Sequence, residues 1–434
     1  MTIRYATYLI LTTGLFIFLV PYFWIYTRIT GRYRRHIKER LGFVPEKTIE
    51  RLSGSHRIWI HAVSLGEVKV AAAVIEALSS MMPGCSLILS TSTEHGRELA
   101  TKTLGEKIPV VYAPIDFIGS VCRALSSVRP DIMVFLETEI WPAWLHQARR
   151  MGIKTALING RISVRSIKGY LRLRPFFSDV LKNIDVFSMI TKGDADRIKA
   201  MGADPQRIEI HGNAKYDRLV GLTNPEMETE IRKAFSLKAS QPVFVAGSTR
   251  DGEEKIVLKA YEEILKEFPD TILIIVPRHI KRTPEIVSLV EKRGFTYQLR
   301  TDFDGSDTKR TARVVIINTF GELFRIYSVG NILFCGASLV PLGGQNILEP
   351  AIWGKMVFYG PSMENFSDAR SLLEKAKAGI QVSGHRELAE RAIWFLGHPE
   401  ELKNAGERAR EAVLKNQGAA KKHAEVIKKL MARV

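Results

Sequence analysis

Short apolar runs alternate with helix-like segments over most of this sequence, and this alternation limits the fold more than any other feature. One series of candidate strands occupies residues 57–62, 86–91, 109–113, 131–136, 154–158, 186–190 and 208–211. A second series occupies residues 242–246, 271–276, 295–299, 313–317, 331–335, 356–359 and 380–382. Helical patterns of the second series fall near 252–268, 284–293, 320–329, 346–353 and 364–377. Strands and helices in alternation predict parallel sheets covered by helices on both faces.

The two series predict an α/β protein with two separate domains, each with its own core. The chain has 434 residues, of which 46% are hydrophobic, and that is enough for two cores. A polar stretch with an Asn-Pro turn signal separates the series and predicts a linker at 218–240. The predicted domains are therefore 41–217 and 241–384, followed by charged helices at 385–434. Two such domains are expected to grip a ligand in a cleft between them.

The N-terminal 40 residues predict a membrane anchor followed by a basic segment. Residues 5–27 carry no formal charge, and at about 1.5 Å rise per residue such a helix could cross a hydrocarbon core of about 30 Å. The aromatic residues Tyr22, Phe23, Trp24 and Tyr26 are typical of a membrane interface. The arginines and lysines that follow place the remaining chain on the cytoplasmic side of the inner membrane. A tilted or monotopic anchor is the alternative, whereas a secretory signal peptide would have a shorter apolar region.

The charge balance favours anionic partners. The net charge is +17, from 63 basic and 46 acidic residues, which suits anionic lipid or a phosphorylated substrate. Nucleic acid is not expected, because no zinc-finger, RNA-recognition or basic-zipper pattern occurs. Cys85, Cys122 and Cys335 are far apart and show neither metal spacing nor a disulfide framework, which suits a reducing compartment.

No metal site is expected either. Asp194-Ala195-Asp196 has the D-x-D pattern of metal-dependent sugar transferases. It opens a predicted helix, however, and helix capping explains it better.

Glu67 is the most informative carboxylate in the first half of the chain. It lies in a Ser-Leu-Gly-Glu turn between the strand at 57–62 and an apolar helical pattern. One interpretation is helix capping, and a carboxylate at a helix N-terminus tends to stay ionised. The other is a general base at the carboxyl end of a strand, where open α/β sheets place their ligands. The spacing alone leaves both interpretations open.

Further polar residues follow the strands of the first half. Glu137 and Glu139 come just after a buried strand, and two carboxylates there are costly unless they are paired or functional. Lys215 lies where the first series ends and could reach a substrate carboxylate or phosphate. Residues 161–177 interleave basic with apolar and aromatic side chains, a composition suited to a lipid phosphate. A mixed surface helix is the alternative for that segment.

Three stretches of the second half lie at predicted strand ends. Pro277 and Arg278 close one strand, and an arginine there could bind a phosphate. Phe320, Gly321 and Glu322 lie where a strand becomes a helix, so backbone N–H groups would face an anion. The stretch 343–350 combines a glycine pair, Asn346 and Glu349, which suits a nucleotide-sugar site or a capping box. Neither a P-loop nor a G-x-G-x-x-G fingerprint is present.

Taken together, these stretches resemble one known family, the 3-deoxy-D-manno-octulosonic acid (Kdo) transferases of lipopolysaccharide synthesis. The motifs that carry the resemblance, in the order of the family, are SLGEV at 64–68, LETEIWP at 136–142, NGRIS at 159–163, GNAKYD at 212–217, AGSTRDGEE at 246–254, VPRH at 276–279, FGEL at 320–323 and GGQNILEP at 343–350. The resemblance implies a GT-B fold, CMP-Kdo as donor substrate, lipid IVA as acceptor and no cofactor. Phe320 and Ala214 depart from the residues expected at their positions.

The resemblance also implies roles for individual residues. Glu67 would be the general base of an inverting transfer, and Glu137 and Lys215 would stabilise the transition state. The residues implied to hold the CMP group are Pro277, Arg278, Phe320, Gly321, Glu322, Asn346, Ile347, Leu348 and Glu349. Two other functions remain open: a GT-B enzyme that uses a UDP-sugar, such as a lipid A disaccharide synthase or an epimerase, and a membrane-anchored lipid-binding module without catalysis.

Overall fold

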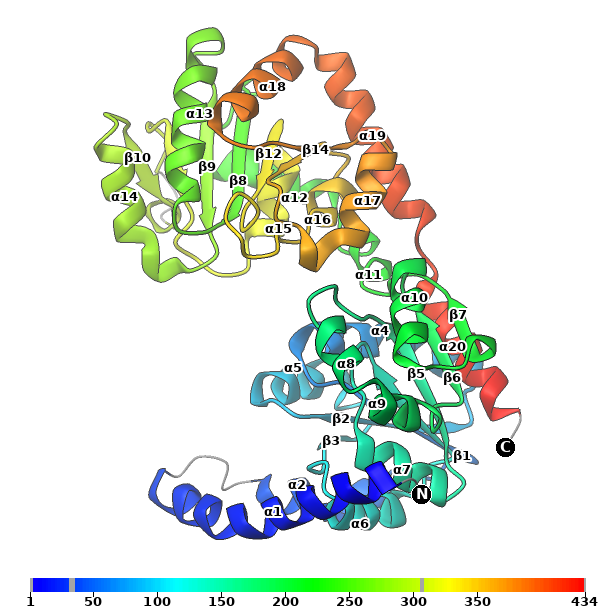
Figure 1. The fold of residues 1–434 in the computed structure, drawn as a ribbon. Helices are drawn as coiled ribbons and strands as arrows, with labels where there is room; N and C mark the ends of the chain where they lie inside the picture. Colours follow the sequence, from blue (N-terminus) through cyan, green and yellow to red (C-terminus); the bar gives the residue numbers. More distant parts are fainter. Residues whose placement is uncertain (1–2, 31–35, 305–307, 433–434) are drawn as a thin grey trace. The chain divides into compact units, whose positions relative to one another are not determined.

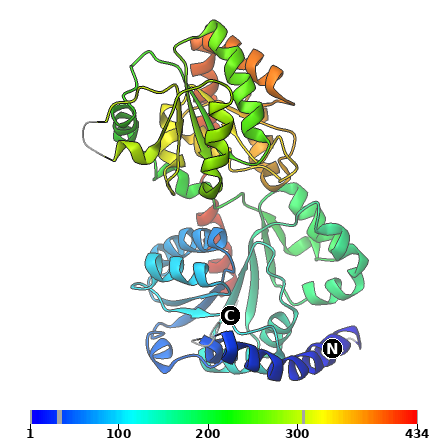
Figure 2. The ribbon, with the colours of Figure 1, turned by 90° about the vertical axis from the view of Figure 1, so that its left-hand side faces the viewer.

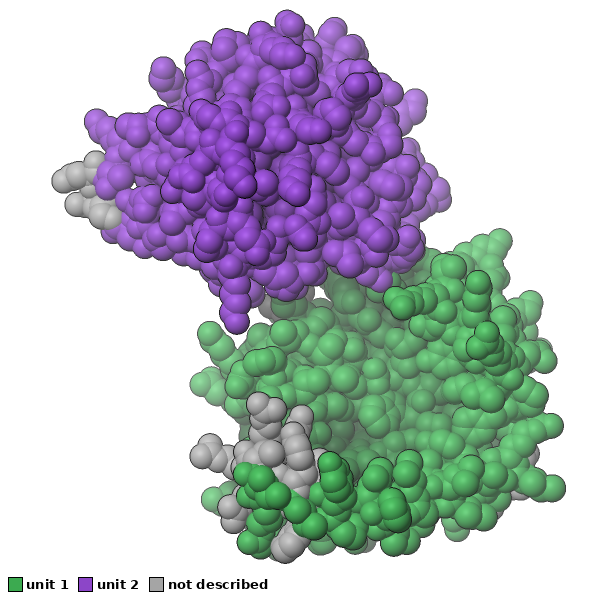
Figure 3. All heavy atoms as spheres, turned by 60° about the vertical axis from the view of Figure 1, so that its left-hand side comes forward, with its two compact units in different colours: residues 1–217, 417–434 green, residues 218–416 purple. Residues whose placement is uncertain are grey.

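A computed structural model describes residues 3–30, 36–304 and 308–432 of the chain (Figure 1). The chain forms two compact units (Figure 3). Unit 1 comprises residues 1–217 and 417–434, and unit 2 comprises residues 218–416. Each unit is built around one sheet of seven strands.

The sheet of unit 1 is parallel throughout, in the order β3-β2-β1-β4-β5-β6-β7. Its strands are β1 (His56–His61), β2 (Cys85–Thr91), β3 (Val110–Tyr112), β4 (Ile132–Leu136), β5 (Lys154–Gly160), β6 (Val186–Met189) and β7 (Ile208–Ile210). Ile58, Trp59 and Ile60 are all completely buried although neighbouring side chains of a strand point to opposite faces. Both faces of the sheet are therefore covered, as Figure 2 shows for this unit.

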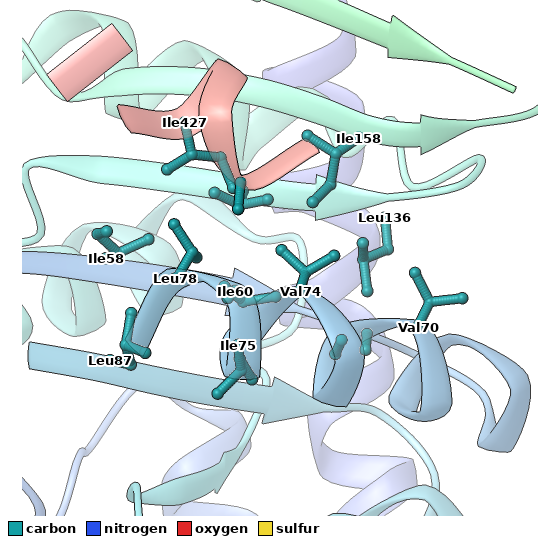
Figure 4. Close-up of a cluster of buried hydrophobic side chains, with 14 of the residues drawn as sticks. Ile58, Ile60, Val70, Val74, Ile75, Leu78, Leu87, Leu136, Ile158 and Ile427 are labelled. Atoms are coloured by element: carbon teal, nitrogen blue, oxygen red, sulfur yellow. The ribbon is translucent and has the colours of Figure 1, made fainter. Parts of the chain in front are cut away.

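Helices before and between the strands provide that cover. They are α4 (Leu65–Met81), α5 (Glu94–Leu104), α6 (Ile118–Val128), α7 (Pro142–Arg150), α8 (Ile167–Arg172), α9 (Arg174–Leu181) and α10 (Lys192–Met201), with the short α2 (Ile37–Arg40), α3 (Glu46–Glu50) and η2 (Pro205–Arg207). On one face, Val70, Val74 and Leu78 of α4 pack with Ile58 and Ile60 of β1 (Figure 4). These side chains recur at helical spacing, so one stripe of α4 is buried.

The C-terminal helix α20 (Ala419–Met431) belongs to unit 1. It packs against α4, and Ile427 joins the same apolar cluster (Figure 4). Its first turn is held by Asp217, whose carboxylate accepts hydrogen bonds from the N–H groups of Gly418 (2.8 Å) and Ala420 (2.6 Å). Unit 2 consists of the 199 residues Arg218–Asn416, which separate the two stretches of unit 1. The Asp217 carboxylate joins the end of the first stretch to the start of the second.

Unit 2 repeats the plan with a second parallel sheet, in the order β10-β11-β9-β8-β12-β13-β14. Its strands are β8 (Val243–Thr249), β9 (Ile272–Pro277), β10 (Tyr297–Leu299), β11 (Val314–Ile316), β12 (Ile332–Cys335), β13 (Val357–Tyr359) and β14 (Gly379–Gln381). Its helices are α11 (Asp217–Val220, which begins at the last residue of unit 1), α12 (Pro225–Ala234), α13 (Glu253–Glu267), α14 (Thr283–Glu291), α15 (Leu323–Ile326), α16 (Leu348–Ile352), α17 (Ser367–Lys375), α18 (His385–Gly397) and α19 (Pro399–Lys415), with the 3-10 turns η3 (Ile280–Arg282), η4 (Arg300–Phe303), η5 (Tyr327–Val329) and η6 (Glu364–Phe366).

Every strand predicted from the sequence is present, and the α/β prediction is confirmed. The segments between and after the sheets differ from the prediction. The stretch 218–240 contains α12, which contacts α15 within unit 2. The predicted block of helices at 385–434 is divided, because α18 and α19 belong to unit 2 and α20 to unit 1.

The prediction of a transmembrane helix at 5–27 is not supported. Within the described parts of the chain, no helix combines the length and the apolar character needed to cross a membrane. Residues 3–30 form α1 (Ile3–Thr30), which belongs to unit 1 and contacts α9. Tyr5 is only 3% exposed and donates to the carbonyl of Pro142, and the Tyr8 hydroxyl donates to Asp116 (2.9 Å). Arg32, Arg34 and Arg35 of the predicted basic segment lie outside the described residues.

Asp217 gives a test of how α20 is held. Asp217→Ala removes the acceptor of two N–H groups in the first turn of the helix, so we expect the free energy of unfolding to fall by about 0.5–2 kcal/mol. Urea denaturation measures this loss. Asp204→Ala is the matched control, because Asp204 caps only the exposed three-residue turn η2. An equal loss in both variants would contradict a special role for Asp217.

Candidate active site

Glu67 lies where β1 gives way to α4 in unit 1. Ser64 is the N-cap of α4, and its hydroxyl oxygen accepts from the Glu67 N–H at 3.3 Å. In return, the Glu67 carboxylate accepts from the Ser64 hydroxyl (2.8 Å) and from the Val63 N–H (2.8 Å). The side chain is 7% exposed, and both of its oxygens have a donor. The local sequence therefore fixes the position of this carboxylate through helix-capping chemistry.

Capping does not exclude a role in catalysis. Burial raises the pKa of Glu67, although the Val63 N–H, the Ser64 hydroxyl and Lys215 lower it and Glu137 raises it further. The expectation that the helix start would keep this carboxylate readily ionised is thus outweighed by desolvation. A carboxylate with a raised pKa is a stronger proton acceptor than an exposed one, which suits a general base.

Glu137 and Lys215 form an ion pair beside Glu67. Glu137 directly follows β4, and its Oε1 lies 2.6 Å from the Lys215 Nζ. The Lys215 side chain also passes over the first turn of α4, because a Cβ built on Gly66 would lie 3.9 Å from Nζ. The structure thus brings together, within unit 1, the three residues that the sequence singled out in that half. Glu137 has a φ of +52°, a strained conformation for a residue with a side chain.

The loop that carries Lys215 is held by two asparagines. Asn159, at the end of β5, accepts from the Ala214 N–H at 2.9 Å, and Asn213 accepts from the Lys215 N–H at 3.1 Å. Asn159 is fully buried and also has a positive φ, of +49°. Asn159 lies in the motif at 159–163, but no role for this residue was predicted from the sequence. The available signal was a polar residue ending an apolar strand.

Glu139 is a further carboxylate of this edge that the prediction left without a role. Burial raises its pKa to about 7, and the charges of Glu67 and Glu137 raise it as well, whereas a hydrogen bond from the Trp141 indole lowers it. Three carboxylates and one lysine thus share the carboxyl ends of β1 and β4. The physical reason for the raised pKa is that neighbouring like charges and low solvent access both disfavour ionisation.

His61, the last residue of β1, is a core residue rather than a proton acceptor. Its ring packs beside the indoles of Trp141 and Trp144, and its Nδ1 lies 3.0 Å from the Ser90 hydroxyl. Complete burial lowers its pKa to about 4, so the ring is neutral near pH 7.

In unit 2, Pro277 and Arg278 close β9 as predicted. The Arg278 N–H donates to the Thr249 carbonyl (3.1 Å), and its side chain is exposed. After the neighbouring strand β11, Glu322 pairs with Arg300 at 2.8 Å and accepts from the Thr319 hydroxyl. Phe320 is 87% exposed and Gly321 has a φ of +91°. The helix α15 that follows has only four residues, so its dipole is small and single N–H groups would contact an anion.

The stretch 346–349 differs from its prediction in two ways. The helix begins at Leu348 rather than at Asn346, and the Asn346 side chain accepts from the Leu348 N–H at 3.2 Å. It also donates to Glu349 at 3.3 Å. The side chains of Ile347 and Leu348 are completely buried in the core. Of these two residues only the backbone can contact a ligand, whereas Asn346 and Glu349 are partly exposed.

Glu253 positions this region, and the sequence reasoning did not single it out. It is completely buried and accepts from the backbone N–H groups of Ala337 (2.6 Å), Ser338 (3.0 Å) and Leu339 (2.9 Å). The Ala337 carbonyl in turn accepts from Gly344 at 2.8 Å. This carboxylate therefore fixes the loop that leads to the glycine pair and Asn346, a long-range arrangement that no local pattern reveals.

Asp194 confirms the capping interpretation of the D-x-D pattern. It bonds reciprocally with the N-cap residue Thr191, and it also accepts from the Ile162 N–H and from Arg197. Both of its carboxylate oxygens are thus used within the fold. Among the residues with described positions, no group of three or more His, Cys, Asp or Glu side chains is arranged to hold a metal ion.

Comparison with solved structures confirms the predicted GT-B fold class. The UDP-GlcNAc 2-epimerase from Neisseria meningitidis, solved with UDP-GlcNAc bound, superimposes with a TM-score of 0.61. That similarity covers 87% of this chain and 100% of the epimerase at 15% sequence identity, so it shows the fold alone.

Comparison with known sequences shows the family. Residues 35–218 match the family described as 3-deoxy-D-manno-octulosonic-acid transferase (kdotransferase). A bifunctional glycosyltransferase/methyltransferase of Fusobacterium nucleatum is 30% identical over 364 residues, 82% of this chain, which spans 56% of that longer relative. The 3-deoxy-D-manno-octulosonic acid transferase of Haemophilus influenzae is 30% identical over 404 residues, 93% of each chain. This chain belongs to the 3-deoxy-D-manno-octulosonic acid transferase family.

Proposed function

We propose that the protein transfers Kdo from CMP-Kdo to lipid IVA, an acylated and phosphorylated sugar, with inversion and without a metal ion. The observation that carries this proposal is the arrangement in unit 1, where a buried carboxylate with a raised pKa, Glu67, lies beside the Lys215–Glu137 ion pair. The family relationship supports Kdo transfer in lipopolysaccharide synthesis, and the carboxylate arrangement supports the chemistry assigned to the individual residues.

On the acceptor side, Glu67 is proposed to take the proton of the attacking hydroxyl group. The hydroxyl oxygen forms the new bond to the anomeric carbon of Kdo, while the bond from that carbon to the phosphate oxygen of CMP breaks. An acceptor hydroxyl here takes the place of the water used by inverting sugar hydrolases. Lys215, whose charge is balanced by Glu137 at 2.6 Å, stabilises the negative charge that develops as CMP leaves.

On the donor side, unit 2 is proposed to hold CMP. Arg278 is exposed at the end of β9 and offers a charged donor for the phosphate. Glu349 offers acceptors for the ribose hydroxyls. Gly321, Asn346 and the backbone around Ile347 lie at the carboxyl edge of the same sheet, which is where open α/β sheets bind ligands.

The protein is proposed to bind the acceptor at the cytoplasmic face of the inner membrane. The basic and apolar segment on and around α8 supports this, because Arg165, Lys168, Arg172 and Arg174 are exposed there beside the exposed Leu171. Such a surface attracts anionic lipid headgroups at about 1 kcal/mol per basic side chain.

Glu67→Gln tests the general base. Glutamine keeps the size of the side chain but cannot take the proton, so we expect turnover to fall by at least about 100-fold with CMP affinity unchanged. Turnover and the urea midpoint are measured on the same preparation, with mass spectrometry to detect the Kdo product.

Ser64→Ala is the matched control, because it removes the cap of α4 and one hydrogen bond to Glu67 but keeps the carboxylate itself, which still accepts from the Val63 N–H. We expect it to lower the free energy of unfolding by about 0.5–2 kcal/mol and to retain most of the turnover. A Glu67→Gln protein with a lowered urea midpoint that transfers Kdo at the wild-type rate would show that Glu67 serves as a cap alone.

Arg278→Ala and Glu349→Ala test the donor site. Each removes one charge-assisted contact to CMP, so we expect calorimetry to show weaker CMP binding by about 1–3 kcal/mol. Lys281→Ala, which removes an exposed positive charge three residues from Arg278, is expected to have no effect. Unchanged CMP affinity in the first two variants would remove these residues from the donor site. Binding of UDP as tight as that of CMP would favour a UDP-sugar enzyme.

Chelation tests the metal-independent mechanism. We expect full activity in EDTA, because Asp194 uses both carboxylate oxygens within the fold. The measurement is Kdo transfer before and after dialysis against the chelator. Activity that is lost on dialysis and restored by Mg²⁺ or Mn²⁺ would contradict the proposal.

A further inference from the structure

A groove opens on unit 1 between the N-terminal half of α1 and the segment that forms α8 and α9. Its volume is about 830 Å³, within the range of about 300–1,000 Å³ that small-molecule sites occupy. Leu11 and Thr7 of α1 line one side, and Leu173 and Phe177 line the other. The groove is thus formed by segments more than 150 residues apart in the sequence.

The inner surface of the groove is aromatic and well packed. The ring of Tyr8 lies 5.2 Å from that of Phe176, and the ring of Tyr170 lies 4.7 Å from that of Phe177. Tyr8 is also fixed by its hydrogen bond to Asp116 at 2.9 Å. Rigid aromatic walls that are already packed against one another suit an apolar chain, because little order is lost when one binds.

Positive charge lies at the rim of the groove. Arg4 and Arg172 both line it, and both are exposed. Arg4 is 3.8 Å from Asp179, whose side chain is only 10% exposed. An occupant that matches this surface has an apolar chain for the interior and an anionic group for the arginines.

The groove adjoins the segment that carries two carboxylates of the proposed active site. Ile140 and Pro142 line it and belong to the segment that starts with Glu137 and Glu139. The pKa of Tyr170, a groove residue, is raised by burial and also by the charge of Glu139. The charge of Glu67 in turn raises the pKa of Glu139.

We propose that this groove binds a fatty acyl chain of the acceptor lipid, with an anionic group of the same lipid at Arg172. This inference rests on the proposed function, in which the acceptor is an acylated and phosphorylated sugar. The groove holds the lipid by its chain, and the continuity through residues 139–142 presents the sugar hydroxyl at the side of Glu67.

General adsorption of α1 to a lipid surface is the competing explanation. The helix also exposes apolar side chains that do not line the groove, among them Leu15 (57% exposed), Ile17 (65%) and Phe18 (80%). Adsorption would depend on these residues as much as on Leu11, whereas binding in the groove depends only on the lining residues. The two explanations therefore predict different effects for paired substitutions.

Two double variants separate them. Leu11→Gln with Leu173→Gln changes two groove residues that are 66% and 58% exposed. Leu15→Gln with Ile17→Gln changes two side chains of α1, 57% and 65% exposed, that do not line the groove. All four side chains are largely exposed, so we expect both proteins to fold as the wild type does.

The first measurement is calorimetric binding of dodecyl phosphate below its micelle concentration to the full-length protein. We expect the groove variant to bind at least about tenfold more weakly than the wild type, since two leucine contacts are lost, and the control variant to bind within about twofold of it. Equal losses in both variants, or no binding to the wild type, would overturn the proposal.

Two further ligands identify the source of the affinity. Arg172→Gln is expected to weaken the binding of dodecyl phosphate at least about threefold, because an exposed charge contact is lost. The binding of dodecyl maltoside, which has no charge, is expected to change hardly at all. If inorganic phosphate competes as well as dodecyl phosphate does, the site is a phosphate site and the acyl-chain proposal is wrong.

The second measurement is Kdo transfer to the acylated acceptor and to its fully deacylated form. The groove variant is expected to raise KM for the acylated acceptor by about tenfold and to leave kcat/KM for the deacylated form unchanged. Loss of both activities to the same extent would overturn the proposal. If the wild type transfers no Kdo to either acceptor, the proposed function fails, while binding of dodecyl phosphate still decides on the groove.

Discussion

The ion pair between Lys215 and Glu137 is the interaction on which the arrangement of unit 1 depends. Glu137 directly follows a completely buried strand and has a strained conformation, and its side chain is only 12% exposed. The Lys215 Nζ, 2.6 Å away, supplies the opposite charge that a nearly buried carboxylate needs. The pair also holds the loop 212–217 against the first turn of α4, and so brings the lysine to Glu67. The Lys215–Glu137 ion pair thus both holds this loop in place and positions the lysine for the proposed chemistry.

The chain secures that loop from several sides. Asn159 of β5 and Asn213 fix its backbone, and Asp217 binds the start of α20 after the chain has passed through unit 2. The helix then packs its apolar face on α4, the helix that carries Glu67. A change in the last residues of the chain can therefore reach the candidate active site through packing, without any contact between α20 and a substrate.

Glu67 and Asp194 show how the same local chemistry takes different roles. Each is the third residue of a helix and bonds reciprocally with a Ser or Thr N-cap. Asp194 also binds Arg197 and a backbone N–H, so its charge is neutralised within the fold. Glu67 instead faces Glu137, Glu139 and Lys215 at the edge of a sheet, and its pKa is raised. Surroundings, rather than the capping motif, distinguish the functional candidate.

The sequence by itself determined the two series of strands, the parallel sheets and the helix start at Glu67, because buried parallel strands read as apolar runs and capping involves residues three positions apart. Its order of motifs also indicated the family. Only the tertiary structure decided that α1 packs within unit 1, that α20 returns to α4, and that Ile347 and Leu348 are core residues. It alone gave Asn159, Glu139 and Glu253 their roles. These features depend on contacts between residues far apart in the chain, and no local pattern of hydrophobicity or charge encodes such contacts.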